Sequence, residues 1–79
     1  MTQIDADSLL AQITQIDQRL NQLLHQNELA ERELFLGNVE GDKRSHIVVN
    51  IALRDELAEE LQAHRNLAQT VLRSLLLVK

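Results

Sequence analysis

The stretch Gly37-Asn38-Val39-Glu40-Gly41-Asp42 holds both glycines of the 79-residue chain. Glycine reaches the left-handed backbone region at little cost, so it ends helices and turns chains. On either side runs a long apolar repeat, and the chain has no proline to interrupt it. We therefore predict an all-α fold, a single antiparallel helical hairpin over residues 1–79. Its helices span about 5–36 and about 43–77, joined by a turn at 37–42.

Acidic residues mark the start of both predicted helices. Asp5 can cap the first helix, because its carboxylate accepts hydrogen bonds from backbone amides of the first turn. Asp42 can do the same for the second helix. The basic pair Lys43-Arg44 then lies at a helix N-terminus, where the helix dipole disfavours positive charge. Either this pair reaches across the turn to acidic residues such as Glu33, or the helix begins at Ser45.

The composition argues against several classes of function. The chain has no cysteine, so it forms no disulfide and no thiolate metal site. Its net charge is −4 and its one aromatic residue is Phe35, whereas nucleic-acid binding needs a basic face or aromatic platforms. The longest apolar runs, 47–49 and 75–78, are far too short to span a membrane, and the first ten residues lack the basic start of a secretory signal. We expect no nucleic-acid partner, no membrane partner and a cytoplasmic location.

The first predicted helix carries an apolar heptad row. The steps between its members alternate between four and three residues, which is the pattern of a coiled-coil seam. The row consists of Leu9, Ile13, Ile16, Leu20, Leu23, Asn27, Ala30 and Leu34. Asn27 is its one polar member. An asparagine in a seam typically sets the register of the helices at some cost in stability.

The second predicted helix carries a core stripe with similar spacing. The stripe consists of Val49, Leu53, Leu57, Leu61, His64, Ala68, Val71, Leu75 and Val78. We expect His64 to be half-buried with its ring tipped outward, and a pH switch is the alternative interpretation. Folding the hairpin about its turn places Asn27 opposite residues 50–53. We predict that Asn27 and Asn50 pair their amides there, so that the polar residues of the seam are Asn27, Asn50 and His64.

More apolar side chains are present than one seam can bury. A helix that is apolar on several sides is buried on several sides, which a lone hairpin cannot achieve. The surplus residues are Leu29, Phe35, Leu36, Ile47, Val48, Ile51, Leu72, Leu76 and Leu77. We predict that they form an interface. Through it two hairpins would make a homodimeric antiparallel four-helix bundle, or the hairpin would bind a different protein.

Residues with reactive side chains form no recognisable catalytic pattern. None of the histidines, His25, His46 and His64, has a second histidine three or four positions away. Glu60 precedes His64 by four residues, whereas helical metal-carboxylate sites repeat a Glu-x-x-His pattern. No glycine-rich phosphate loop is present, and no serine has a histidine placed as a base. We therefore expect no enzymatic activity, no cofactor and no metal site.

One stretch resembles a known enzyme family. The pattern Ile13-x-x-Ile16-Asp17-x-x-Leu20-x-x-Leu23-Leu24-x-x-Asn27-x-x-Ala30 is similar to the first helix of the all-helical chorismate mutases. In that family the position matching Asn27 is an arginine that holds a substrate carboxylate, whereas here it is a neutral amide. The resemblance implies a degenerate small-molecule-binding domain. In length and topology alone, the chain also looks like the small hairpin co-chaperones of type III secretion needle subunits.

These features favour a function in protein–protein interaction. The chain would be a small adaptor, co-chaperone or inhibitor without catalysis of its own. The alternatives are the degenerate small-molecule-binding domain and a phage or mobile-element inhibitor of a host protein. An apolar groove left on the folded protein would favour a protein partner. A closed polar cavity holding both His64 and Asn27 would favour a small ligand.

Overall fold

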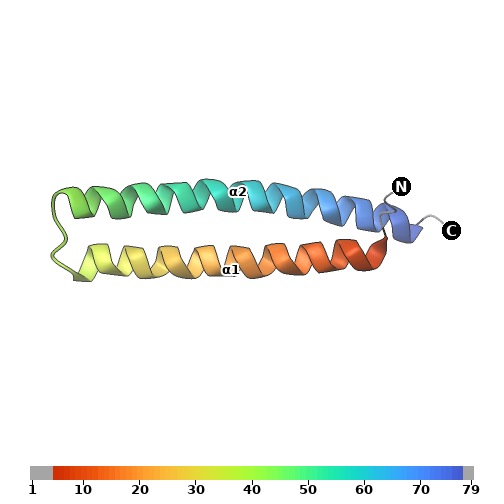
Figure 1. The fold of residues 1–79 in the computed structure, drawn as a ribbon, viewed down its shortest axis with the longest axis horizontal. Coiled ribbons are helices and arrows are strands. Elements are labelled where there is room, and N and C mark those ends of the chain that lie inside the picture. Colours follow the sequence, from red (N-terminus) through yellow and green to blue (C-terminus); the bar gives the residue numbers. More distant parts are fainter. Residues whose placement is uncertain (1–4, 78–79) are drawn as a thin grey trace.

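Two long helices joined by one turn make up the computed structural model, which describes residues 5–77 (Figure 1). Helix α1 spans Ala6–Leu36 and helix α2 spans Asp42–Leu77. The helices lie side by side and run in opposite directions, so that the start of α1 and the end of α2 lie at the same end of the molecule (Figure 1). The predicted all-α helical hairpin is confirmed.

Local hydrogen bonds explain where the helices end. The amide of Gly37 donates to the carbonyl oxygen of Glu33 at 2.9 Å and closes α1. Gly41 has a φ of 68°, a left-handed conformation that glycine adopts without strain. The amide of Ser45 donates to the Gly41 carbonyl oxygen at 3.2 Å, so Asp42 is the first residue of α2 rather than its cap. Lys43 Nζ lies 3.6 Å from Glu33 Oε1. Of the two alternatives for the basic pair, Lys43 therefore reaches across the turn to Glu33, and the helix does not begin at Ser45.

Asp5 caps α1 as predicted, and this cap makes the stability of the protein sensitive to acid. The amide of Ser8 donates to Asp5 Oδ1 at 2.7 Å. This backbone hydrogen bond, together with one from the Ser8 hydroxyl, lowers the pKa of Asp5 below its ordinary value of 3.8. A carboxylate whose pKa is lowered by folding stabilises the protein above that ordinary value, and the contribution is lost as the pH falls through the folded-state pKa.

We expect the Asp5→Asn variant to lose less stability than the wild type on acidification. Asparagine keeps a side-chain oxygen that can cap the helix but has no carboxylate to titrate. The measurement is the free energy of unfolding from urea titrations between neutral pH and a pH below 3.8. Parallel pH profiles for the two proteins would contradict the role assigned to the Asp5 carboxylate.

The heptad row predicted on α1 faces α2. All eight of its members are buried or half-buried, whereas their neighbours on the outer face are exposed. Leu23 is 1% exposed and is the one large side chain of the described residues that is fully buried. A second cluster, nearer the end remote from the turn, joins Leu9 and Ile13 of α1 to Ala68 of α2. Apolar packing therefore holds the hairpin at two levels along its length.

The face of α2 that packs on α1 differs from the predicted stripe. Leu61, Ala68 and Val71 are buried or half-buried as expected, and Val78 lies outside the described residues. The prediction is wrong for five members of the stripe, which are exposed: Val49, Leu53, Leu57, His64 and Leu75. The row that faces α1, which we call the inward row, consists of Ile47, Ile51, Arg54, Ala58, Leu61, Arg65, Ala68 and Leu72.

The inward row contains two arginines because α1 presents polar groups to it. Arg54 hydrogen-bonds to Asn27, and Arg65 pairs with Asp17. A buried or half-buried polar group is costly without a partner. The face of α2 that supplies these partners therefore packs inward, and five residues of the predicted stripe are left exposed.

Candidate functional site

Asn27 is the centre of a polar cluster in the seam. It is 7% exposed. Its Nδ2 donates to Asp55 Oδ1 at 2.8 Å and makes a longer contact of 3.5 Å with the carbonyl oxygen of Ile51, while its Oδ1 accepts from Arg54 Nε at 2.6 Å. No buried polar side-chain atom of the described residues lacks a hydrogen-bond partner. The position predicted to set the register is thus tied to a single turn of α2, from Ile51 to Asp55.

The predicted pair between Asn27 and Asn50 is wrong. Asn50 is exposed. The side chains that hydrogen-bond to Asn27 are those of Arg54 and Asp55, about one turn after Asn50 in α2. His64 is also exposed, so neither Asn50 nor His64 lies in the seam of the hairpin. The reason is the rotation of α2 about its own axis, which points Ile51 and Arg54 inward and carries Asn50 and His64 outward.

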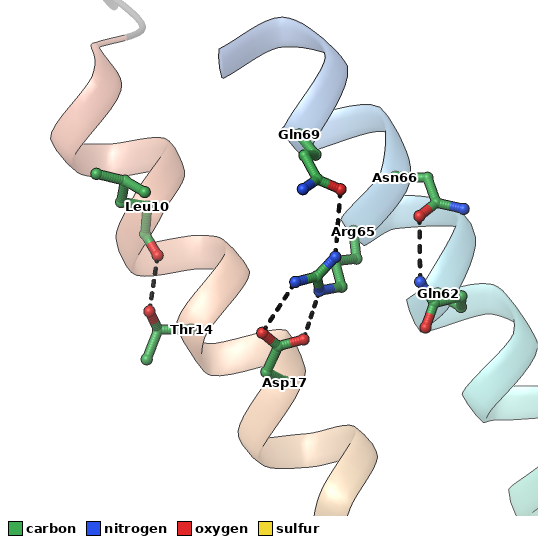
Figure 2. Close-up of polar contacts among 7 residues, drawn as sticks. All are labelled: Leu10, Thr14, Asp17, Gln62, Arg65, Asn66 and Gln69. Carbon is green, nitrogen blue, oxygen red and sulfur yellow. Dashed lines mark hydrogen bonds and ion pairs between the residues drawn. The ribbon is translucent and has the colours of Figure 1, made fainter. Parts of the chain in front are cut away.

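A second polar contact joins the helices about three turns further from the hairpin turn (Figure 2). Arg65 Nε donates to Asp17 Oδ1 at 2.5 Å, and a second guanidinium nitrogen donates to Asp17 Oδ2 at 3.3 Å. Gln69, one turn along α2, accepts from the third nitrogen at 3.3 Å. The hydrogen bond with Asp17, and then its negative charge, raise the pKa of Arg65.

Sequence reasoning did not identify Arg54, Asp55 or Arg65 as residues of the seam. A signal was nevertheless present. The two arginines are eleven residues apart, a distance that the four-and-three repeat places on one face of a helix. Asp17 and Asn27 are ten residues apart on α1. Each helix thus carries two polar residues with nearly the same separation along the chain. This match indicates that the polar residues of the two helices can face each other in the seam.

Two grooves run along the seam on opposite sides of the hairpin. The first, of about 560 Å³, passes Asp17 and Asn27 and has Leu20 and Ala58 among its lining residues. The second, of about 280 Å³, is lined mostly by apolar side chains, namely Leu9, Ile16, Leu67, Ala68 and Val71, together with Gln12 and His64. Gln62 lines the first groove and His64 the second. These residues are two positions apart, which is more than half a helical turn, so the grooves lie on opposite sides.

The polar groups of the first groove are engaged with one another. Asp17 is paired with Arg65, and the amide of Asn27 is hydrogen-bonded on both its nitrogen and its oxygen. Asn27 lines the first groove and His64 the second, so neither of these two grooves holds both. Among residues 5–77 no cluster of three histidine, aspartate or glutamate side chains could hold a metal ion. The second groove is the more apolar of the two.

The residues predicted to form an interface fall into two groups. Ile47, Ile51 and Leu72 are half-buried in the inward row, where they pack within the hairpin. Six others remain exposed, namely Leu29, Phe35, Leu36, Val48, Leu76 and Leu77. Their role as an interface stays a prediction.

Neither helix contains, within the described residues, a segment long and apolar enough to cross a membrane. Comparison of the chain with family models, with curated proteins and with solved structures finds no match.

Proposed function

We propose that the chain is a non-catalytic protein–protein interaction module that works as a homodimer, in the role of a small adaptor, co-chaperone or inhibitor. One observation carries the proposal. Thirteen large apolar side chains of the described residues are exposed, whereas three are buried, Leu9, Ile13 and Leu23. Monomeric soluble proteins rarely expose such an extended apolar surface unless it binds something.

The total surface of the hairpin supports the same proposal. The chain exposes 6482 Å², whereas a compact folded monomer of 9.0 kDa exposes roughly 4,900 Å². The surplus is roughly 1,600 Å², and a standard interface buries about 800 Å² on each partner. One hairpin therefore has enough surplus surface to form a dimer interface and still present apolar residues to another protein.

We expect sedimentation equilibrium at micromolar concentration to give twice the chain mass of 9.0 kDa. Circular dichroism on the same samples should show a helical protein whose thermal midpoint rises with concentration, because association stabilises the folded state by mass action. A folded monomer whose stability does not depend on concentration would contradict the proposal.

A further inference from the structure

A second row of residues follows α2 beside the inward row, and of its members Val71 packs against the core cluster of the hairpin. Seven of its members are exposed, and Val71 is half-buried. Its members are separated by alternating steps of three and four residues, the spacing of a coiled-coil seam. We call this the outer row, and it consists of Asn50, Leu53, Leu57, Glu60, His64, Leu67, Val71 and Ser74. α2 therefore has two seams, and α1 covers one of them.

The outer row has the same pattern when it is read in either direction. The midpoint of the row is Gln62. On both sides of it, the members of the row lie two, five, nine and twelve residues away. Two copies of α2 that run antiparallel about this midpoint would bring apolar residues against apolar residues and an acid against an imidazole. The facing residues would be Asn50 with Ser74, Leu53 with Val71, Leu57 with Leu67, and Glu60 with His64.

Such a palindromic arrangement is what a two-fold symmetric interface requires. In an isologous dimer, if residue i contacts residue j of the partner, then j also contacts i of the partner. A parallel pairing would instead place Glu60 against the partner's Glu60, and like charges facing each other are unfavourable. The antiparallel pairing lets each His64 donate a hydrogen bond to the partner's Glu60 carboxylate.

The second groove lies where this pairing needs space. His64, Leu67 and Val71 line one wall of it, and Gln12 and Ile16 of α1 lie on the other. The antiparallel register places the partner's Leu53 and Leu57 beside this wall. A cavity of about 150 Å³ accommodates a benzene molecule, so the 280 Å³ of the groove leaves room for two leucine side chains.

The charge on the opposite side of the hairpin argues against a dimer through the first groove. Asp55 lines that groove, and Glu59 lies one turn further along the same face of α2. Asn21 and Leu24 of α1 also line this groove. Glu28 and Glu31 come seven residues after them, so these two acids lie on the same face of α1. These four acids make this side of the hairpin more negative than the outer row, whose one acid, Glu60, faces an imidazole in the antiparallel pairing.

We infer that the outer row of α2 is the dimer interface, with two copies of α2 packed antiparallel about Gln62 and Glu60 paired with the partner's His64. The inference rests on the homodimer proposed above and adds its face, direction and register. It places the dimer on the outer row, so the exposed residues first predicted for the interface, among them Val48 and Leu76, are left for another protein. A second copy of the chain is the occupant because the row is complementary to itself in both apolar character and charge.

Disulfide cross-linking tests the register, since the chain has no cysteine of its own. Asn50 and Ser74 are exposed and polar, so Asn50→Cys and Ser74→Cys leave the hairpin core untouched. An equimolar mixture of the two variants should form a covalent dimer in a redox buffer. Each variant alone should not, because two copies of the same position lie about 36 Å apart in the antiparallel pair, at 1.5 Å per residue, and a disulfide needs Cα atoms within about 7 Å.

A matched pair on the opposite face provides the control. Val48 and Leu76 are equally distant from Gln62 and are 47% and 64% exposed. Val48→Cys mixed with Leu76→Cys should give no covalent dimer. Cross-linking of this pair instead of the first would place the interface on the other face, and cross-linking of either single variant with itself would indicate a parallel dimer. Both results overturn the inference. The inference is also overturned if sedimentation shows a dimer but neither pair of variants cross-links. If sedimentation shows a folded monomer, the proposed function is overturned as well.

A second measurement compares two leucines of similar exposure. Leu67 of the outer row is 63% exposed and Leu24 beside the first groove is 60% exposed. Leu67→Glu should raise the dimer dissociation constant by about a hundredfold or more, since each dimer contains two such leucines. Leu24→Glu should leave the dissociation constant within about threefold of the wild type. Equal effects of the two substitutions would overturn the inference.

Discussion

Replacement of Leu23 by alanine lowers the free energy of unfolding by about 3 kcal/mol, within the range of about 2–5 kcal/mol for leucine-to-alanine changes in protein cores. Leu23 is 1% exposed and lies midway along the seam of a hairpin that buries few large side chains. The truncation removes apolar contacts and leaves a cavity that two straight helices cannot easily close. Because a small domain has about 5–15 kcal/mol in total, this one change removes a large share of its stability.

The neighbouring residue supplies a matched control. Leu24 is 60% exposed, and Leu24→Ala makes the same chemical change one position further along the same helix. We expect it to cost less than about 1 kcal/mol. Both variants are measured by urea titration at one fixed chain concentration, because self-association makes the apparent stability depend on concentration. Similar losses for the two variants would contradict the rotation of α1 about its axis that the structure shows.

Replacement of Asn27 by leucine costs about 1–3 kcal/mol, because it leaves the half-buried Arg54 without the oxygen that accepts from its Nε. The loss should be largely recovered when Arg54 is also replaced by leucine. Two apolar side chains then meet in the seam, and substitution of both partners of a hydrogen bond by apolar groups can be nearly neutral. A double-mutant cycle of Asn27→Leu and Arg54→Leu should give a coupling energy of at least about 1 kcal/mol.

Asn50 serves as the control in this cycle. It is exposed and shares no hydrogen bond with Asn27. The effects of Asn27→Leu and Asn50→Leu should therefore add to within about 0.5 kcal/mol. A larger coupling between the two asparagines than between Asn27 and Arg54 would mean that α2 is rotated relative to the arrangement described above.

The seam of α1 could be predicted from the sequence because that helix has one continuous apolar row, and its other apolar residues form no second row. Glutamines and charged residues occupy most of its outer face, so a single orientation buries the apolar side chains. The cap at Asp5 and the turn glycines were predictable for a similar reason. Each depends on backbone chemistry within a few residues, and no distant part of the chain has to be known.

The orientation of α2 could not be chosen in this way, because that helix has two rows with similar spacing. The predicted stripe contains more leucines than the inward row, yet it contains no partner for Asn27 or Asp17. The inward row does, through Arg54 and Arg65. The cost of unsatisfied polar groups on α1 thus outweighs the difference in apolar area between the two rows of α2. The polar cluster depends on the register of both helices, which neither helix reveals alone.

The uneven distribution of buried residues has a consequence for amide hydrogen exchange. Residues 28–67, which include the turn and more than half of α2, contain no buried side chain, and the apolar cluster around Ile13 and Ala68 lies at the end remote from the turn. Opening of the helices from the turn therefore breaks fewer apolar contacts than opening from the other end. Amides near the turn exchange through local fluctuations, whereas those around Ile13 are protected until the whole hairpin unfolds.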